Sequence, residues 1–175
     1  GLIITVDNGI VSYQGINRAK EIGLPVLITD HHLAGEGVPD TVIVNPNQPG
    51  CKFPSKALAG VGVAFYVLIA LRAYFREKKV FDKGPNLLKQ LDLVALGTVA
   101  DCVPLDFNNR NMVSQGLALM RAGRARPGIK ALIEVAKRSP CLLEADDMGF
   151  SLAPRLNAAG RLDDMSIGVR CLLAK

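Results

Sequence analysis

Two short runs of apolar, β-branched residues, joined by one amphipathic segment, constrain this chain more than any other feature. The runs are Leu2–Val6 and Val26–Thr29, and both have the length and the flanking turn residues of buried strands. Apolar residues recur every three positions from Ile16 to Ile22, which predicts a helix over about residues 12–23. A strand, a helix and a strand in this order make a βαβ unit with parallel strands. The unbroken apolar run also predicts that the first strand is buried on both faces.

Side chains that can bind a metal ion follow both strands. Asp7 comes after the first strand, and Asp30, His31 and His32 come after the second. Parallel strands end at one edge of a sheet, where open α/β sheets bind their ligands. A polar loop would explain one isolated histidine. The only two histidines of the chain are adjacent and follow an aspartate, which favours a site at this edge.

The rest of the chain is predicted to be largely helical. A short strand is expected over residues 41–44, and helices are expected over about 58–78, 87–96, 109–122, 128–138 and 165–174, with a shorter piece near 145–153. The predicted fold class is α/β. Residues 1–105 would form a parallel sheet with helices on both faces, and residues 106–175 would form a helical extension.

Composition excludes several classes of protein. The chain is 49% hydrophobic and 21% charged, so it can form a core and is not disordered. Four well-separated cysteines without a CxxC pair favour reduced thiols in the cytoplasm. The longest apolar run, residues 57–71, is shorter than the ~20 residues that span a bilayer. A net charge of +5 is compatible with a polyanionic partner but does not identify one.

A third carboxylate, Asp101, follows an apolar helix that is expected to end near Gly97. An ionised aspartate among apolar neighbours needs a partner or a metal ion. Asp7, His31 and Asp101 form an oxygen and nitrogen ligand set without cysteine, which suits Mn²⁺ or Mg²⁺ better than structural zinc. Two such ions hydrolyse phosphate esters, and Asp7 could bridge them. Two ions need further ligands, which we expect from a strand preceding Gly1 in a longer protein.

Four segments invite alternative interpretations. Gly60-Val61-Gly62 lacks the spacing of a phosphate-binding loop, so close helix packing is favoured. The basic segment Arg121–Lys130 is interpreted as a solvated loop rather than a phosphate contact. Arg155–Arg161 is expected to be a turn whose small residues let a polymer backbone approach. Asp163 and Asp164 are interpreted as a cap of the last helix rather than a metal pair.

Several motifs resemble those of the DHH phosphoesterase superfamily. They are Val6–Gly9, Asp30–His32 and Leu96–Asp101. Further segments resemble the bacterial members that degrade single-stranded DNA from its 5′ end, and these are Ala59–Phe65, Gly97–Leu105 and Arg155–Met165. The resemblance runs over essentially all 175 residues. The superfamily's Asp-x-Asp motif, its C-terminal substrate-binding half and the OB-fold are not in this sequence, which therefore resembles the central part of a catalytic core.

The resemblance implies a role for each candidate residue. Asp7, His31 and Asp101 would ligate Mn²⁺ or Mg²⁺ in a two-metal site, with Asp7 bridging. His32 would face the scissile phosphate, and Asp30 would orient both histidines. DNA phosphates would be contacted by Arg155, Asn157 and Arg161.

The implied function is a metal-dependent 5′-to-3′ exonuclease of DNA repair and recombination, inactive as this piece alone. The implied partners are single-stranded DNA, a single-stranded-DNA-binding protein and a helicase. A cytoplasmic monomer with no membrane contact is expected. One alternative is another DHH hydrolase, acting on pyrophosphate, oligoribonucleotides or cyclic dinucleotides. The other is a DHH-like scaffold of the replication machinery that has lost catalysis.

Overall fold

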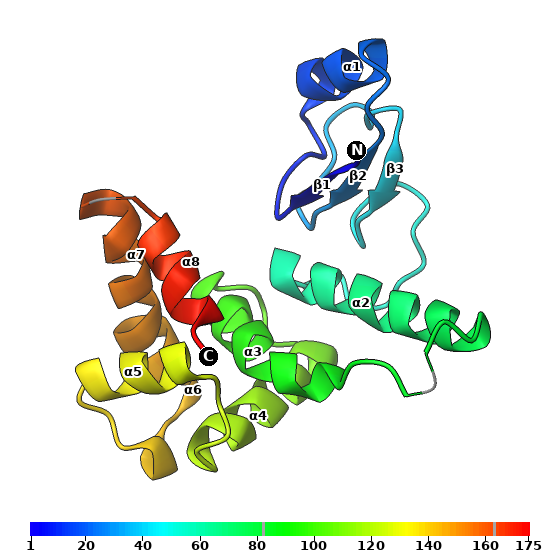
Figure 1. Cartoon of the computed structure of the whole chain (residues 1–175). Coiled ribbons are helices and arrows are strands. Elements are labelled where there is room, and N and C mark those ends of the chain that lie inside the picture. The colour runs from blue at the N-terminus through cyan, green and yellow to red at the C-terminus, as the bar shows by residue number, and fades with distance from the viewer. Residues whose placement is uncertain (82, 163) are drawn as a thin grey trace. The chain divides into compact units, whose positions relative to one another are not determined.

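The computed structural model describes residues 1–81, 83–162 and 164–175. The chain divides into two compact units, residues 1–85 and 86–175, and each is described by itself (Figure 1). The boundary precedes the expected one at residue 105, because α3 (Leu91–Ala100) packs along α4 (Phe107–Arg121) in the second unit. The assignment of residues 1–105 to one α/β domain stays a prediction.

A parallel three-stranded sheet forms the centre of the first unit. Its order is β1 (Ile3–Val6), β2 (Val26–Thr29) and β3 (Val42–Val44). The register pairs the last residues of the three strands with one another, so the strands end level at one edge. Helix α1 (Tyr13–Glu21) connects β1 to β2. The predicted α/β class and the βαβ unit are confirmed (Figure 1).

Helix α1 covers one face of this sheet. Its residues Ile16 and Ala19 pack against Val26 and Ile28 of β2. The opposite face is less protected among the described residues, and Ile4 is 55% exposed there. The prediction that β1 is buried on both faces is wrong for this chain, because β1 is an edge strand that α1 covers from one side only.

Helix α2 (Gly60–Glu77) confirms the long helix expected over 58–78. Its first turns are buried, including Gly60, Gly62 and Val63. Its middle is less buried, and Leu68 and Leu71 are each 43% exposed. Within the described ranges, no helix combines the length and hydropathy needed to cross a membrane.

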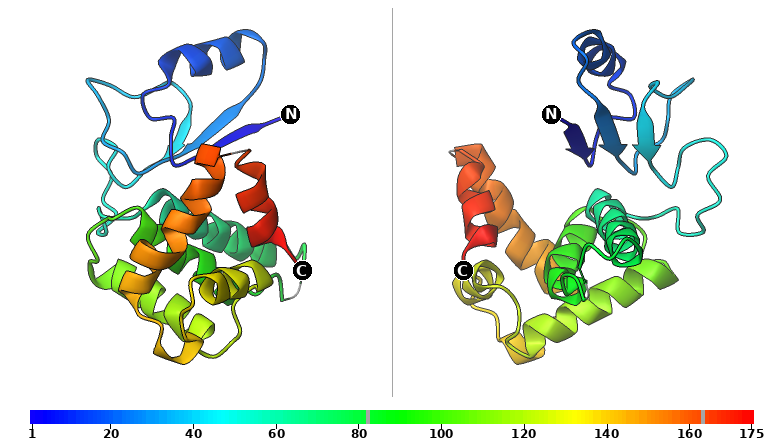
Figure 2. Two further views of the ribbon diagram at one scale, coloured as in Figure 1. Left: turned by 90° about the vertical axis from the view of Figure 1, so that its left-hand side faces the viewer. Right: turned by 45° about the vertical axis from the view of Figure 1, so that its right-hand side comes forward.

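The second unit is helical, as predicted. Its core gathers side chains from most of its helices, including Ala95, Ile129, Leu143 and Leu152. Figure 2 shows α7 and α8 side by side. Besides α3 and α4, the elements are η1 (Leu87–Gln90), α5 (Pro127–Val135), η2 (Pro140–Leu142), α6 (Ala145–Asp147), the π-helical η3 (Met148–Leu152), α7 (Ala153–Leu162) and α8 (Ser166–Leu173).

Two local predictions in this unit are wrong. Residues 97–100 continue helix α3 instead of leaving it. The segment Arg155–Arg161 is part of helix α7 rather than a turn. Pro154 is the second residue of α7 and directly follows the π-helical turn η3, so the helical chain continues through it.

The basic segment Arg121–Lys130 is also more structural than a solvated loop. Arg126 forms an ion pair with Asp92, whose side chain is 1% exposed, at 3.0 Å, and its backbone N–H donates to the same carboxylate at 2.8 Å. Arg121 donates to the carbonyl of Leu143. At the start of α8, Asp164 accepts hydrogen bonds from the N–H and the hydroxyl of Ser166. This agrees with the capping interpretation for Asp164, while Asp163 lies outside the described residues.

Candidate metal centre

A buried carboxylate organises the end of β2. The Asp30 side chain is 1% exposed, and its Oδ2 accepts from the N–H of Ile10 at 2.9 Å. Its Oδ1 accepts from the backbone N–H groups of His31 and His32 at 2.7 and 3.1 Å, and from the His32 ring Nδ1 at 2.7 Å. Burial would raise the pKa of Asp30, but these hydrogen bonds, led by that of Ile10, lower the pKa below its usual value. Asp30 is therefore an ionised acceptor.

The ionised Asp30 also decides which nitrogen of His32 carries a hydrogen. Because a carboxylate only accepts, Nδ1 of His32 is the donor, and in the neutral ring Nε2 carries the lone pair. Carboxylate–histidine pairs of this kind fix the ring and raise its basicity at metal centres. The role expected of Asp30, to orient the histidines, agrees with this geometry.

Asp7 and His31 meet at the edge of the sheet, although 23 residues separate them in the chain. Asp7 Oδ1 lies 3.1 Å from His31 Nε2. Two neighbouring ligands of an octahedral ion with bonds of 2.0–2.1 Å are separated by roughly 3 Å, so this pair has the spacing of two ligands of one ion. Together with His32 they form a group whose ligand atoms all lie within 4.8 Å of one another.

The backbone conformation of Asp7 and its packing against α2 define where its carboxylate lies. Asp7 has a φ of 64°, a left-handed conformation that aspartate tolerates better than most residues. The first residue of α2, Gly60, packs directly against it, since a Cβ at position 60 would lie 2.3 Å from Asp7 Oδ1. Gly60 thus allows close packing, as predicted. The group that it packs against is the side chain of Asp7, the candidate metal ligand.

Two asparagines that the sequence analysis did not single out also belong to this edge. Asn45 and Asn47 follow β3, and their side-chain amides donate to the backbone carbonyls of His32 and His31. The signal was available in the sequence as two amides directly after the predicted strand 41–44. It was missed because that strand could not be placed in the sheet from its sequence alone.

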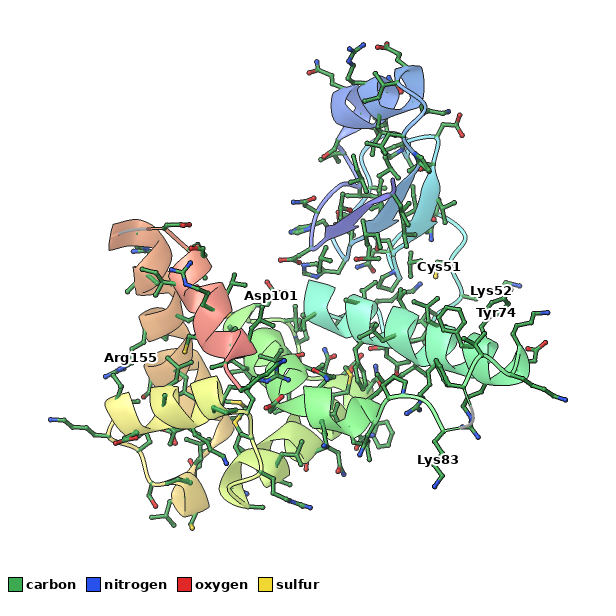
Figure 3. The ribbon with its side chains drawn as sticks, viewed as in Figure 1. Cys51, Lys52, Tyr74, Lys83, Asp101 and Arg155 are labelled. Carbon is green, nitrogen blue, oxygen red and sulfur yellow. The ribbon has the colours of Figure 1, made fainter. Side chains whose placement is uncertain are left out.

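Asp101 lies in the second unit, at the C-cap of α3 (Figure 3). The expectation of an aspartate buried among apolar neighbours is wrong, because Asp101 is exposed at the end of the helix. Its role as a metal ligand stays a prediction.

The three candidate DNA contacts all lie on helix α7. Asn157 and Arg161 are one helical turn apart on the same exposed face, while Arg155 projects elsewhere and donates to the Ser151 carbonyl at 2.6 Å (Figure 3). One of the small residues between them, Gly160, has a packing role within the second unit. A Cβ at Gly160 would lie 3.0 Å from Met165, so this glycine accommodates the segment that leads into α8.

Comparison with known proteins identifies the family to which this edge belongs. The profile of the DHH family, N-terminal domain, matches residues 1–98, more than half of the chain. The chain belongs to the DHH family. The matched region contains Asp7, Asp30, His31 and His32.

The DHH chain is also similar over nearly its whole length to curated exonucleases. It is 61% identical to the single-stranded-DNA-specific exonuclease RecJ of Salmonella typhimurium over 98% of this chain, and 59% identical to that of Escherichia coli. It spans only 31% of the length of either relative.

Solved structures of similar proteins share the fold. A crystal structure of exonuclease RecJ bound to manganese superimposes with a TM-score of 0.81 at 35% identity, covering 98% of this chain and 41% of that one. RecJ of Thermus thermophilus in complex with Mn²⁺ gives 0.80 at 34% identity, covering 99% of this chain and 25% of that one. The DHH fold predicted from the sequence is confirmed.

We predict that Gly60→Ala weakens metal binding without unfolding the protein. The added methyl group would displace the Asp7 carboxylate, whereas alanine at the first position of α2 is compatible with the helix. Calorimetric titration with Mn²⁺ should show at least tenfold weaker binding. The control is Gly15→Ala in α1, where a Cβ would meet nothing within 4 Å. Equal Mn²⁺ affinities of the two variants would contradict the packing argument.

We also predict that Asp30 governs part of the acid sensitivity. Because its pKa is lowered by folding, ionised Asp30 stabilises the protein above its unfolded pKa of about 3.9. This contribution is lost as the pH falls through the lower, folded pKa. Asp30→Asn, which leaves buried donors poorly matched, should cost about 1–3 kcal/mol at pH 7 and should flatten the decline in stability below pH ~5.

Urea unfolding measured across pH checks this prediction. The control is Asp40→Asn, which removes an exposed carboxylate that pairs with Lys20. It should leave the stability at pH 7 and the acid profile close to those of the unmodified protein. A steep acid decline that persists in Asp30→Asn would assign the acid sensitivity to other groups.

Proposed function

We propose that this chain is the metal-binding part of a phosphodiesterase that degrades single-stranded DNA from its 5′ end, in DNA repair and recombination. The observation that carries the proposal is the convergence of Asp7 and His31, 3.1 Å apart, beside His32. The 61% identity to a single-stranded-DNA-specific exonuclease supports this substrate. Because the chain spans 31% of that relative, the activity is proposed for a longer protein that includes it.

The proposed cofactor is Mn²⁺ or Mg²⁺. The donor set fits these ions, because it combines a carboxylate with imidazole and contains no thiolate. Similar proteins have been crystallised with manganese and with Mg²⁺. Bound in a pair, such ions supply an activated water and stabilise the leaving oxygen.

Individual residues of this chain would bind the metal ions, face the substrate or orient a catalytic side chain. Asp7 and His31 would hold metal, and Asp101 is proposed as a further ligand. His32, whose side chain is 58% exposed, would face the scissile phosphate with its orientation fixed by Asp30. This extends the role of Asp30 from holding the loop to orienting a catalytic side chain.

Phosphate contacts are proposed for helix α7. Asn157 and Arg161 can present an amide and a guanidinium to one backbone segment, because they lie on one face. Arginine suits this role since it donates two parallel hydrogen bonds to a phosphate. Arg155 is proposed as a further contact from a neighbouring face. A single-stranded-DNA-binding protein and a helicase as partners, a monomeric state and a cytoplasmic location rest on the resemblance alone.

We predict that His32 is required for cleavage. In a version of the protein extended in both directions with the segments that its longer relatives possess, His32→Ala should reduce digestion of 5′-labelled single-stranded DNA by at least 100-fold. Its melting temperature should stay close to that of the unmodified protein. The control is Leu33→Ala, a neighbouring side chain that is 78% exposed, which should cleave normally. Full activity of His32→Ala would remove His32 from the catalytic residues.

The same assay separates the alternative functions. Preferred hydrolysis of pyrophosphate, oligoribonucleotides or cyclic dinucleotides would assign the protein to another branch of DHH hydrolases. DNA binding without any hydrolysis in the presence of Mn²⁺ would favour the non-catalytic scaffold. The 175-residue chain alone should show almost no nuclease activity, because two ions need more ligands than it offers.

We predict that Arg161 contacts a phosphate. In the extended protein, Arg161→Ala should weaken single-stranded DNA binding for all sequences alike. The slope of log affinity against log salt should become shallower by roughly 0.7, the value for one phosphate contact on a single strand. The control is Arg18→Ala, which removes an exposed arginine of α1 that pairs with Glu21. A lower melting temperature with an unchanged salt slope would show that Arg161 is structural.

A further inference from the structure

The loop after β3 reaches back to the two histidines. Asn45 is buried, at 2% exposure, and its Nδ2 donates to the carbonyl of His32 at 2.9 Å. Asn47 Nδ2 donates to the carbonyl of His31 at 2.6 Å. The two asparagines are also joined to each other, since the Asn47 N–H donates to Asn45 Oδ1 at 2.7 Å.

With these contacts, every backbone N–H and C=O group of His31 and His32 has a hydrogen-bond partner. The N–H groups of His31 and His32 donate to the buried Asp30 carboxylate, and their carbonyls accept from the two asparagines. All four backbone polar groups of this segment are therefore engaged by side chains. The backbone fixes where each imidazole is attached and which rotamers it can adopt, so the asparagines help to set where both rings lie.

The loop that carries the asparagines is itself braced. Lys56 Nζ donates to the carbonyls of Pro46 and Cys51 at 2.6 and 2.7 Å. The amide of Asn47 also donates to the Lys56 carbonyl at 3.1 Å. Hydrogen bonds within the loop therefore hold the two asparagine amides in position.

We propose that Asn45 and Asn47 are positioning residues of the metal centre. They fix the backbone of His31 and His32 so that His31 keeps its distance to Asp7 and His32 keeps its orientation. The inference rests on the proposed function. Neither asparagine is proposed to touch the metal ion or DNA, and both act through the two histidines.

A purely structural role makes a different prediction. Buried amides commonly satisfy loop carbonyls, and their removal costs stability wherever they occur. If that were their whole role, their truncation would lower stability without changing metal affinity. Outer partners that orient metal ligands instead change metal affinity or activity by 10- to 100-fold.

The experiment compares Asn45→Ala and Asn47→Ala with Gln48→Ala. Gln48 is a matched control because its side-chain amide, in the same loop, donates to the carbonyl of Ile43 in β3 and not to the histidines. Calorimetric titration of the 175-residue chain should show Mn²⁺ binding about tenfold weaker in both asparagine variants. Gln48→Ala should bind Mn²⁺ as the unmodified protein does.

Kinetics in the extended protein give a second readout. Both asparagine variants should lose about tenfold in kcat on single-stranded DNA while KM stays within about twofold, because the DNA contacts proposed for α7 are untouched. Asn47 is only half-buried, so Asn47→Ala decides the question if Asn45→Ala fails to fold.

The outcomes separate this inference from the function on which it rests. Asparagine variants that match Gln48→Ala in Mn²⁺ affinity and kcat would overturn the positioning role and leave the proposed function intact. An unmodified protein that neither binds Mn²⁺ nor, once extended, cleaves DNA would overturn the proposed function and this inference together.

Discussion

The structure of the candidate centre depends on one buried charge. A carboxylate that is removed from water is costly unless it accepts several hydrogen bonds, and Asp30 accepts them from Ile10, His31 and His32. The bond to Ile10 ties the end of β2 to the segment that leads from β1 into α1. Folding this unit around an ionised Asp30 therefore requires both connections to be formed. The same hydrogen bonds that make the burial tolerable also orient the two histidines.

Because the three strands end level, polar side chains from distant parts of the chain meet at one edge of the sheet. Asp7, the two histidines and the asparagines each follow a different strand. Precision at this edge comes from short, specific restraints: a left-handed backbone at Asp7, a glycine that leaves room for its carboxylate, and amides that hold the histidine carbonyls. A scaffold of this kind holds metal ligands more accurately than a flexible loop would.

The sequence was sufficient where local pattern decides the structure. The strands, the βαβ unit and the meeting of Asp7 with His31 follow from periodicity and from the parallel crossover, and the structure agrees. It was insufficient where position in the tertiary structure decides. The exposure of β1 depends on its place at the sheet edge, and the exposure of Asp101 depends on where α3 ends. Arg155–Arg161 contains two alanines, the best helix formers, and the chain enters it from the π-helical turn η3, so that neither Pro154 nor Gly160 ends the helix.

Some cationic residues of the second unit bind other groups of the protein, and others lie on an exposed face. The net charge of the chain is therefore a weak indicator of DNA binding. Arg126 forms an ion pair with the buried Asp92, and Arg121 donates a hydrogen bond to the carbonyl of Leu143. Both guanidinium groups therefore have partners within the protein. On α7, Gly160 accommodates the segment that leads into α8, while Asn157 and Arg161 lie on an exposed face. Affinity for a polyanion depends on cations that can reach phosphate oxygens, so the geometry of this face is a stronger argument for DNA contact than the overall charge.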